Sequence, residues 1–286
     1  MTQPIYDPRR AAPRAALTFS LAALLALAGC AGPGKQPEFI AANPQVLLLG
    51  EVHDSAAGHR LRFEQLRKRV EAGWRPAIAM EQFDREQQSL LSRAQKDCRE
   101  AECVIQVMST AGARWEWQHY RPIIDLAMTY GLPLVAANLS RADASRVVRD
   151  GVASSFDAKT VAEYRLNEAL PADVVQVQQK EIVAGHCNML PEMMVGGMVN
   201  AQVARDIWMA KLVRAQQPRD VVLIAGNGHV RKDIGVPRWL GAVEPKLTLR
   251  SEAYAESAQA PGLYDVVHQV GAQARPDPCA SLKPKS

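Results

Sequence analysis

The stretch VLLLGEVHDSAAGHR, residues 46–60, sets the pattern for the whole chain. Its first four residues are apolar and are closed by Gly50, which is typical of a short strand buried on both faces. Glu51, His53 and His59 follow this strand, and the apolar residues after position 60 take helical spacing. A buried strand followed at once by a helix is the repeating unit of an α/β fold with a parallel sheet.

The same alternation recurs along the chain. Further strands are expected over 76–83, 132–140, 220–229, 246–254 and 263–270, and helices after position 85, over 120–131 and over 190–216. Residues 141–185 are expected to form helices joined by loops, and the last two strands to lie at the sheet edge. The sequence therefore predicts an α/β fold with a mainly parallel sheet, helices on both faces, and a helical insertion or cap.

Polar side chains follow each of the four core strands, at the point where the strand ends. They are Glu51, His53, Glu81, Asn138, Asn227 and His229. Because ligands of open parallel sheets bind at the carboxyl ends of the strands, we expect these side chains to line one cleft. Structural alternatives exist for some of them: Glu51 could cap a helix, and His53 could be a surface imidazole. His59 lies inside the following helix, so its place in the cleft is a weaker inference.

Two other segments concentrate ligand-type residues. GHCNMLPEMMVGGM, residues 185–198, holds His186 and four of the nine methionines, Met193 and Met194 among them. Methionines on a helix are commonly core residues, but they also suit broad apolar ligands. Gly196 and Gly197 each cost a helix about 1 kcal/mol relative to alanine, which favours a close approach by a flat ligand or another backbone. The second segment, RWEWQHY, ends in His119 and Tyr120 and could equally be an aromatic hinge that anchors the next helix.

The N-terminus has the pattern of a bacterial lipoprotein signal. Residues 1–29 combine three arginines with an apolar run that ends in LAG before Cys30. We expect cleavage there, lipidation of Cys30, and a flexible tether over 30–43 that leads into a single domain, 44–286. An ordinary secretory peptide is the alternative. Ala31 after the cysteine favours the outer membrane, which gives a lipid-anchored location in the bacterial cell envelope.

The four remaining cysteines could form disulfides. An envelope location permits disulfides, and Cys98 and Cys103 are close enough in sequence to close a small loop. Free thiols are the alternative, and the pairing of Cys187 and Cys279 is open.

The net charge of +4 is spread along the chain without a basic stripe, so nucleic acid is not expected as a partner.

Several of these motifs, in order, resemble those of the ChaN family of iron-regulated, haem-binding bacterial lipoproteins. They are LLLGEVHD, EWQHYRPIIDLA, HCNMLPEMM with AQVARDIWMA, and AGNGHVRKDIGVPRWL, within residues 46–240. The resemblance implies haem binding, tyrosine ligation of the iron and dimeric association. Tyr120 is the first candidate for the axial ligand and Tyr164 the second, while His186, Met193 and Met194 are further candidate haem contacts.

The family belongs to a wider group that includes Tiki metalloproteases and TraB-like proteins. That group shares a GE-x-H strand end, an arginine on a later helix and a late histidine, which here are Glu51 with His53, Arg205 and His229. We expect Arg205 to reach the cleft and to pair with one of its carboxylates.

Two specific functions therefore compete at the level of the sequence, beside a third, a binding or scaffold protein whose site is no longer active. The first is a membrane-anchored haem-binding lipoprotein in iron or haem acquisition, with arginines that pair with the haem propionates, a homodimer and an outer-membrane haem receptor as partners. The second is a metal-dependent hydrolase or protease, in which a divalent metal ion is held by Glu51, His53, Glu81 and His229.

Overall fold

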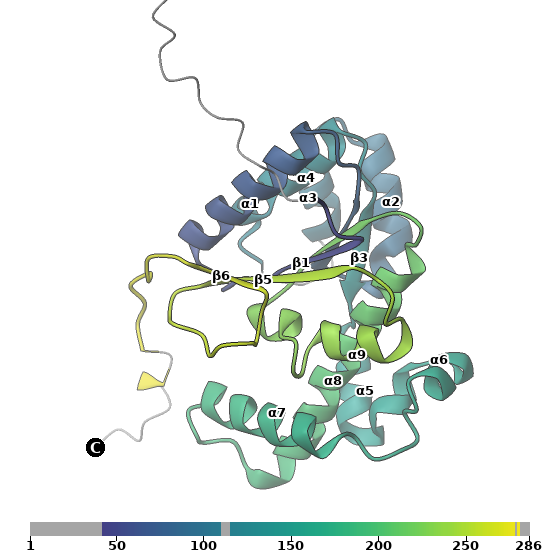
Figure 1. Ribbon diagram of the computed structural model, residues 1–286, viewed down its shortest axis with the longest axis vertical. Helices are drawn as coiled ribbons and strands as arrows, with labels where there is room; N and C mark the ends of the chain where they lie inside the picture. The colour runs from purple at the N-terminus through teal and green to yellow at the C-terminus, as the bar shows by residue number, and fades with distance from the viewer. Residues whose placement is uncertain (1–41, 110–114, 278, 281–286) are drawn as a thin grey trace, which may run out of the picture. The chain divides into compact units, whose positions relative to one another are not determined.

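The computed structural model describes residues 42–109, 115–277 and 279–280. Within them, six strands form one sheet in the order β3-β2-β4-β1-β5-β6, and every neighbouring pair is parallel (Figure 1). The strands are β1 (Val46–Leu49), β2 (Ala77–Asp84), β3 (Leu134–Asn138), β4 (Val221–Ile224), β5 (Leu249–Ala255) and β6 (Val266–Gln269). The predicted mainly parallel sheet is confirmed, and the two last strands lie together at one side of it.

The central strands β1 and β4 are buried at every residue. Successive side chains of a strand point to opposite faces, so Val46 and Leu48 enter one core while Leu47 and Leu49 enter the other. This explains why the opening stretch reads as an uninterrupted apolar run rather than as an alternating one.

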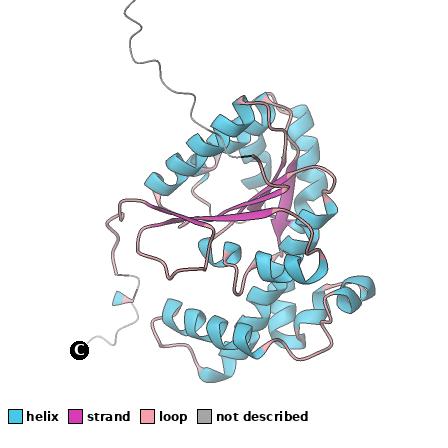
Figure 2. Ribbon diagram, viewed as in Figure 1, coloured by secondary structure: helices cyan, strands magenta, loops and turns pink. Residues whose placement is uncertain are grey.

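Helices cover both faces of the sheet, as predicted (Figures 1 and 2). One face carries α1 (Ala56–Glu71), α2 (Gln88–Asp97), α3 (Ala101–Ser109) and α4 (Arg121–Thr129). The other carries α5 (Arg141–Asp150), α8 (Glu192–Ala215) and α9 (Val236–Val243). The second face is completed by α6 (Ala158–Glu163) and α7 (Ala172–Gly185), which form the helical insertion together with α5.

Local signals place the helix boundaries. Ser55 caps α1, because its hydroxyl accepts a hydrogen bond from the Gly58 amide. Gly131 follows α4 with a φ of 62°, a conformation that glycine adopts without steric cost. None of the helices among the described residues has both the length and the apolar character needed to cross a membrane.

Two disulfides join the described cysteines. Cys98 pairs with Cys103 and Cys187 pairs with Cys279, which resolves a pairing that the sequence left open. The predicted signal peptide, the lipidation site at Cys30 and the tether up to residue 41 lie outside the described residues and stay predictions.

Candidate functional site

The carboxyl edge of the sheet brings the predicted polar side chains together. Glu51 follows β1, Glu81 lies within β2, and His229 lies in a short turn after β4. The Nδ1 atom of His53 is 2.8 Å from Glu51 Oε1, and the Nε2 atom of His229 is 3.6 Å from Glu81 Oε1. A Cβ atom placed on Gly226 would lie 3.3 Å from His53 Nε2 and 3.8 Å from Glu81 Oε2, so both pairs meet at this glycine.

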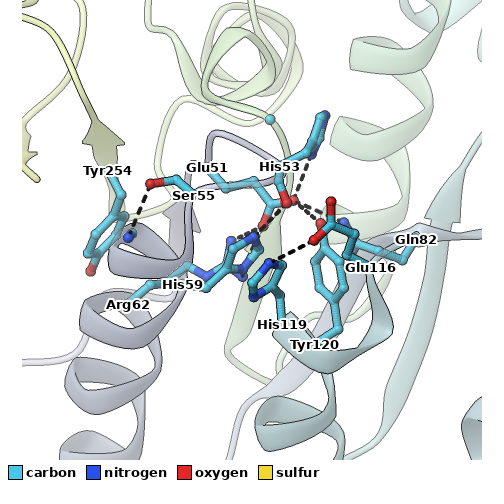
Figure 3. Close-up of polar contacts among 12 residues, drawn as sticks. Glu51, His53, Ser55, His59, Arg62, Gln82, Glu116, His119, Tyr120 and Tyr254 are labelled. Atoms are coloured by element: carbon cyan, nitrogen blue, oxygen red, sulfur yellow. Dashed lines mark hydrogen bonds and ion pairs between the residues drawn. The ribbon is translucent and has the colours of Figure 1, made fainter. Parts of the chain in front are cut away.

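Glu51 is the buried centre of the first pair (Figure 3). Its carboxylate is ion-paired with Arg62 and accepts hydrogen bonds from the Tyr120 hydroxyl at 2.6 Å and the Gln82 amide at 3.2 Å. Burial opposes ionisation, but Arg62 and the hydrogen bond from His53 outweigh it and hold the pKa of Glu51 well below its usual range. Glu51 is therefore an anion with its oxygens fully engaged by protein donors.

His59, on α1, forms hydrogen bonds with two residues of this cluster (Figure 3). Its Nε2 atom donates to the His53 carbonyl at 2.8 Å, and its Nδ1 atom accepts from the Arg62 guanidinium at 2.8 Å. Burial and the nearby Arg62 charge lower the pKa of His59 to about 4, which keeps the ring neutral. His59 thus positions Arg62 and the backbone of His53 and does not itself face the cleft.

His53 is the accessible member of the first pair, with 48% of its side chain exposed. Its Nδ1 atom is occupied by Glu51, so Nε2 is the nitrogen left for a ligand or substrate. Burial opposes protonation, but the Glu51 hydrogen bond and the Glu81 charge raise the pKa of His53. The His53 ring makes a T-shaped contact with the Trp115 ring, with centroids 5.1 Å apart.

His229 is also paired with Asp206, a residue of α8 that was not predicted from the sequence. The Nδ1 atom of His229 lies 2.6 Å from Asp206 Oδ1. The Oε2 atom of Glu81 accepts a hydrogen bond from the Gly226 amide at 2.8 Å. Burial opposes the charge on His229, but Asp206 and Glu81 outweigh it and raise the pKa of His229 to about 9. Burial raises the pKa of Asp206 to about 6, so at pH 7 the two groups form an ion pair.

Arg205 does not form the predicted ion pair with a cleft carboxylate. It is half-buried on α8 and, within the described part of the chain, has no ion-pair partner. The physical reason is the helical rotation of about 100° per residue, which turns Asp206 toward His229 and Arg205 toward α5. Asp206 is adjacent to Arg205 in the run between Ala204 and Ile207, so the sequence alone did not indicate which of the two polar residues faces the site.

The pairs face a cleft of about 500 Å³, within the size range of small-molecule sites. Its other wall comes from α7 and the corner that follows it, which includes Gln178, Ile182 and His186. The cleft therefore lies between the carboxyl edge of the sheet and the helical insertion.

The geometry offers little to the divalent-metal alternative. Among the residues that the structure describes, no group of three His, Cys, Asp or Glu side chains could hold a metal ion. Glu51, one of the four predicted donors, is already ion-paired with Arg62 and accepts hydrogen bonds from Tyr120 and Gln82. Its oxygens are therefore occupied by protein donors.

The two tyrosines predicted as haem ligands occupy unfavourable positions. Tyr120 is fully buried with its hydroxyl donating to Glu51, and burial together with the Glu51 charge raises its pKa, which disfavours the phenolate that would bind ferric iron. Tyr164 is buried beside Glu163, which is ion-paired with Arg214 at the far end of α8. That end lies about 30 Å along the helix from Met194, at 1.5 Å per residue.

Three of the four methionines in the segment 185–198 are exposed, while Met198 packs against the core. Met193 is 91% exposed, Met189 51% and Met194 48%. His186, which lines the cleft, lies three residues before Met189, so the corner between α7 and α8 carries an imidazole and three exposed methionines.

The two helical glycines have different surroundings. A Cβ atom on Gly197 would lie 2.8 Å from Val148 Cγ1 and 3.0 Å from the Val148 carbonyl oxygen, which explains this glycine by the close approach of α5. Gly196 has open space around it among the described residues.

Comparison with known proteins identifies the family. A family model described as "Haem-binding uptake, Tiki superfamily, ChaN" matches residues 40–240. The chain belongs to this ChaN family. No significant match was found among curated proteins.

A solved structure of the family shares the fold of this chain, and more distant matches are weaker. ChaN of Campylobacter jejuni, solved with cofacially bound haem, is 20% identical, with a TM-score of 0.61 over 78% of this chain and 86% of that chain. An erythromycin esterase in its open conformation is 16% identical, with a TM-score of 0.44 over 74% and 70% of the two chains. The type III effector HopBA1 is 12% identical, with a TM-score of 0.42 over 80% and 88%. The ChaN fold therefore extends to this chain, and the haem-binding character of the ChaN family makes haem the ligand to consider first.

Proposed function

We propose that this protein binds haem at the corner between α7 and α8, where His186 is the residue that would hold the haem iron. The observation that carries the proposal is this corner, where Met189, Met193 and Met194 are exposed close to an imidazole that lines the cleft. Membership of the haem-binding ChaN family supports the choice of ligand. When bound, the haem would supply a ferric iron that takes one nitrogen ligand from the chain.

His186 has the tautomer that iron ligation needs. Its Nδ1 atom is 2.7 Å from the Ile182 carbonyl oxygen, which can only accept, so Nδ1 carries the proton. The lone pair of Nε2 is then free to bind a metal, and the Ile182 carbonyl orients the ring as outer-shell partners of ligating histidines do.

The three methionines provide an adaptable apolar surface for the porphyrin. Methionine has a flexible, polarisable side chain that fits irregular flat ligands. Exposed apolar side chains gathered at one place on a soluble protein commonly mark a binding surface, because their exposure to water is unfavourable. Haem binding would remove this surface from water.

A titration with ferric haem tests the proposal. The protein without its signal should give a saturable Soret change, and His186→Ala should weaken haem binding by at least about tenfold, which corresponds to the loss of one ligand bond worth more than about 1.4 kcal/mol. His268→Ala is the matched control, since His268 lies on β6 and pairs with Glu252. Tyr120→Phe should leave the spectrum unchanged.

The outcomes separate the candidates. A changed spectrum in Tyr120→Phe with an unchanged one in His186→Ala would overturn the choice of ligand and return it to the buried tyrosine. The absence of any saturable Soret change in the wild type would overturn haem binding itself.

The cellular role that we propose is haem or iron acquisition at the bacterial envelope. The support is the sequence of the N-terminus, which predicts cleavage before Cys30 and its lipidation, and the family to which the chain belongs. A homodimer and an outer-membrane haem receptor are the proposed partners. Cys30→Ser should release the protein from the membrane fraction, and unchanged fractionation would contradict the anchor.

A second candidate function is hydrolysis by metal-free acid and base catalysis. The observation that favours it is the presence of two imidazoles at one cleft, each backed by a carboxylate: His53 by Glu51, and His229 by Asp206. His53 would act as the general base, and the protonated His229 as the acid. His53→Gln should abolish hydrolysis of p-nitrophenyl acetate while His268→Gln and a chelator leave it unchanged; equal rates in both variants would rule this function out.

A further inference from the structure

A second hollow, of about 170 Å³, lies between α5 and α8 beside the cleft. Arg141 and Ser145 line it from α5, and Met198 and Arg205 line it from α8. Gln202 lines both this hollow and the cleft, so the two adjoin. We refer to it as the arginine hollow.

Its two arginines differ from the other arginines of these helices. Arg146 is 3.1 Å from Asp143, Arg149 is 2.8 Å from Asp150, and Arg214 pairs with Glu163. Arg141 and Arg205 have no carboxylate within ion-pair distance in the part of the chain that the structure describes. Asp84 is an electrostatic neighbour of Arg205, but its Oδ1 atom accepts a hydrogen bond from Asn138 at 3.0 Å.

The hollow has an apolar end and a cationic end. The helices meet closely at Val148 and Gly197, where the missing side chain of the glycine allows the approach. Val148 lines this end and is exposed, and Met194, about one helical turn before Gly197 on α8, is exposed as well. Arg141 and Arg205 lie seven and eight residues away along their helices, which is about 11 Å at 1.5 Å per residue. The positive end of the α5 dipole adds to the charge there, since Arg141 is the first residue of α5.

This combination selects the chemical class of the ligand. An amphiphile with an apolar body and a pair of carboxylates matches both ends, because guanidinium groups bind carboxylates through charge-assisted, often bidentate hydrogen bonds. A neutral apolar ligand would leave both arginines without partners, and a simple anion would leave the methionine and valine exposed.

We propose that Arg141 and Arg205 bind the propionate carboxylates of haem, with the porphyrin lying over Val148, Met194 and Met198. This inference rests on the proposed function and deepens it, because it assigns the carboxylate contacts in addition to the axial ligand. The residues on the α5–α8 surface thereby determine specificity for a porphyrin that carries free acids.

Iron-free protoporphyrin IX tests the inference without the axial ligand. Its fluorescence change on binding should saturate with the wild type, and Arg141→Gln and Arg205→Gln should each weaken binding on the order of tenfold, the size expected for one charge-assisted hydrogen bond. Arg205→Lys should give intermediate affinity, since it keeps the charge and loses the bidentate geometry. Arg149→Gln is the matched control on α5, because Arg149 is exposed and pairs with Asp150.

Protoporphyrin dimethyl ester provides the second arm. It should bind the wild type more weakly than the free acid and should not respond to the arginine substitutions. Equal binding of acid and ester, or arginine variants that behave like Arg149→Gln, would overturn the inference while haem binding through His186 still stands. A wild type that binds neither haem nor protoporphyrin would overturn the inference together with the proposed function.

Discussion

Glu51 shows how a single buried charge organises the site. Its carboxylate is surrounded by Arg62, Tyr120, Gln82 and His53, so every strong contact comes from a different part of the chain. Such a charge is stable in the interior only while its partners are present. The network fixes His53 at the cleft mouth, and the orientation of its free nitrogen follows from the burial of Glu51.

We predict that Glu51→Gln lowers the free energy of unfolding by about 3–5 kcal/mol, because it leaves the buried Arg62 without its counter-charge. Urea denaturation at pH 7 measures this loss. Glu71→Gln is the control, since Glu71 forms an exposed pair with Arg67 and such pairs contribute less than about 1 kcal/mol. The pKa of Glu51 is lowered by folding, so its contribution is present above the unfolded pKa and falls as the pH is lowered. Equal stability of the two variants would contradict this role.

The raised pKa of His229 implies the opposite pH dependence of the free energy of unfolding. Its pKa is raised to about 9 in the folded protein, from about 6.5 in an unfolded chain. The stability that it adds is therefore complete below pH 6.5 and is lost as the pH rises through 9, with a slope of at most about 1.4 kcal/mol per pH unit. Chemical denaturation between pH 6.5 and 9 should show this decline in the wild type and not in His229→Gln. Parallel profiles for both proteins would show that the imidazolium is not stabilised.

The sequence indicated which strand ends carry the site but not which side chains complete it. Glu51, His53, Glu81 and His229 could be found because parallel strands share one carboxyl edge. Asp206 could not, because helical spacing does not decide which of two adjacent polar residues turns toward the sheet. The same limit applies to Tyr120, whose aromatic ring is compatible with a ligand role or with the core until its hydroxyl is seen to donate to Glu51.

At the level of elements, apolar runs and glycine stops located most of the fold. The long helix expected over 190–216 is α8, Glu192–Ala215, and the run at 46–49 is β1. The polar segment after position 85 was less well defined, because it divides into α2 and α3 around the Cys98–Cys103 disulfide. Pairing between distant residues is not encoded in local periodicity, so this division needed the three-dimensional structure.

The free edge of β3 is protected by α2 in a way that the sequence does not reveal. Gln95 donates to the Leu132 carbonyl at 2.6 Å and accepts from the Leu134 amide at 3.0 Å. Gln88 donates to the Leu134 carbonyl at 3.2 Å and accepts from the Ala136 amide at 2.7 Å. The two side-chain amides therefore take the place of a neighbouring strand along an edge that would otherwise be open to other chains.

We predict that Gln88→Leu with Gln95→Leu lowers the free energy of unfolding by about 2–4 kcal/mol, since each substitution leaves backbone groups of β3 unpaired. The exposed edge should also increase self-association, which light scattering at rising protein concentration would detect. Gln106→Leu on α3 is the control, because Gln106 is exposed and its side-chain amide donates to Glu102 on the same helix. If the double variant scatters light like this control, the glutamines do not protect the edge.

At the scale of the whole molecule, the segment after β6 is fastened to two distant parts of the fold. Arg275 pairs with Asp54 after β1 and with Glu256 after β5. Cys279 then forms the disulfide with Cys187, next to His186 at the corner between α7 and α8. The C-terminal segment thus connects the carboxyl edge of the sheet to the insertion that forms the other wall of the cleft.

The two disulfides should contribute unequally to stability. Their sequence separations are 5 for Cys98–Cys103 and 92 for Cys187–Cys279. Closing the longer loop removes more entropy from the unfolded chain, which gives about 2 kcal/mol for the short bridge and about 4–5 kcal/mol for the long one. Cys279→Ser should therefore lower the melting temperature more than Cys98→Ser, as measured by calorimetry. The reverse order would show that the C-terminal segment detaches from the domain before the domain itself unfolds.

The long bridge should also affect haem binding, because Cys187 adjoins His186. Cys279→Ser should weaken haem binding if the bridge holds this corner in place, whereas Cys98→Ser should not.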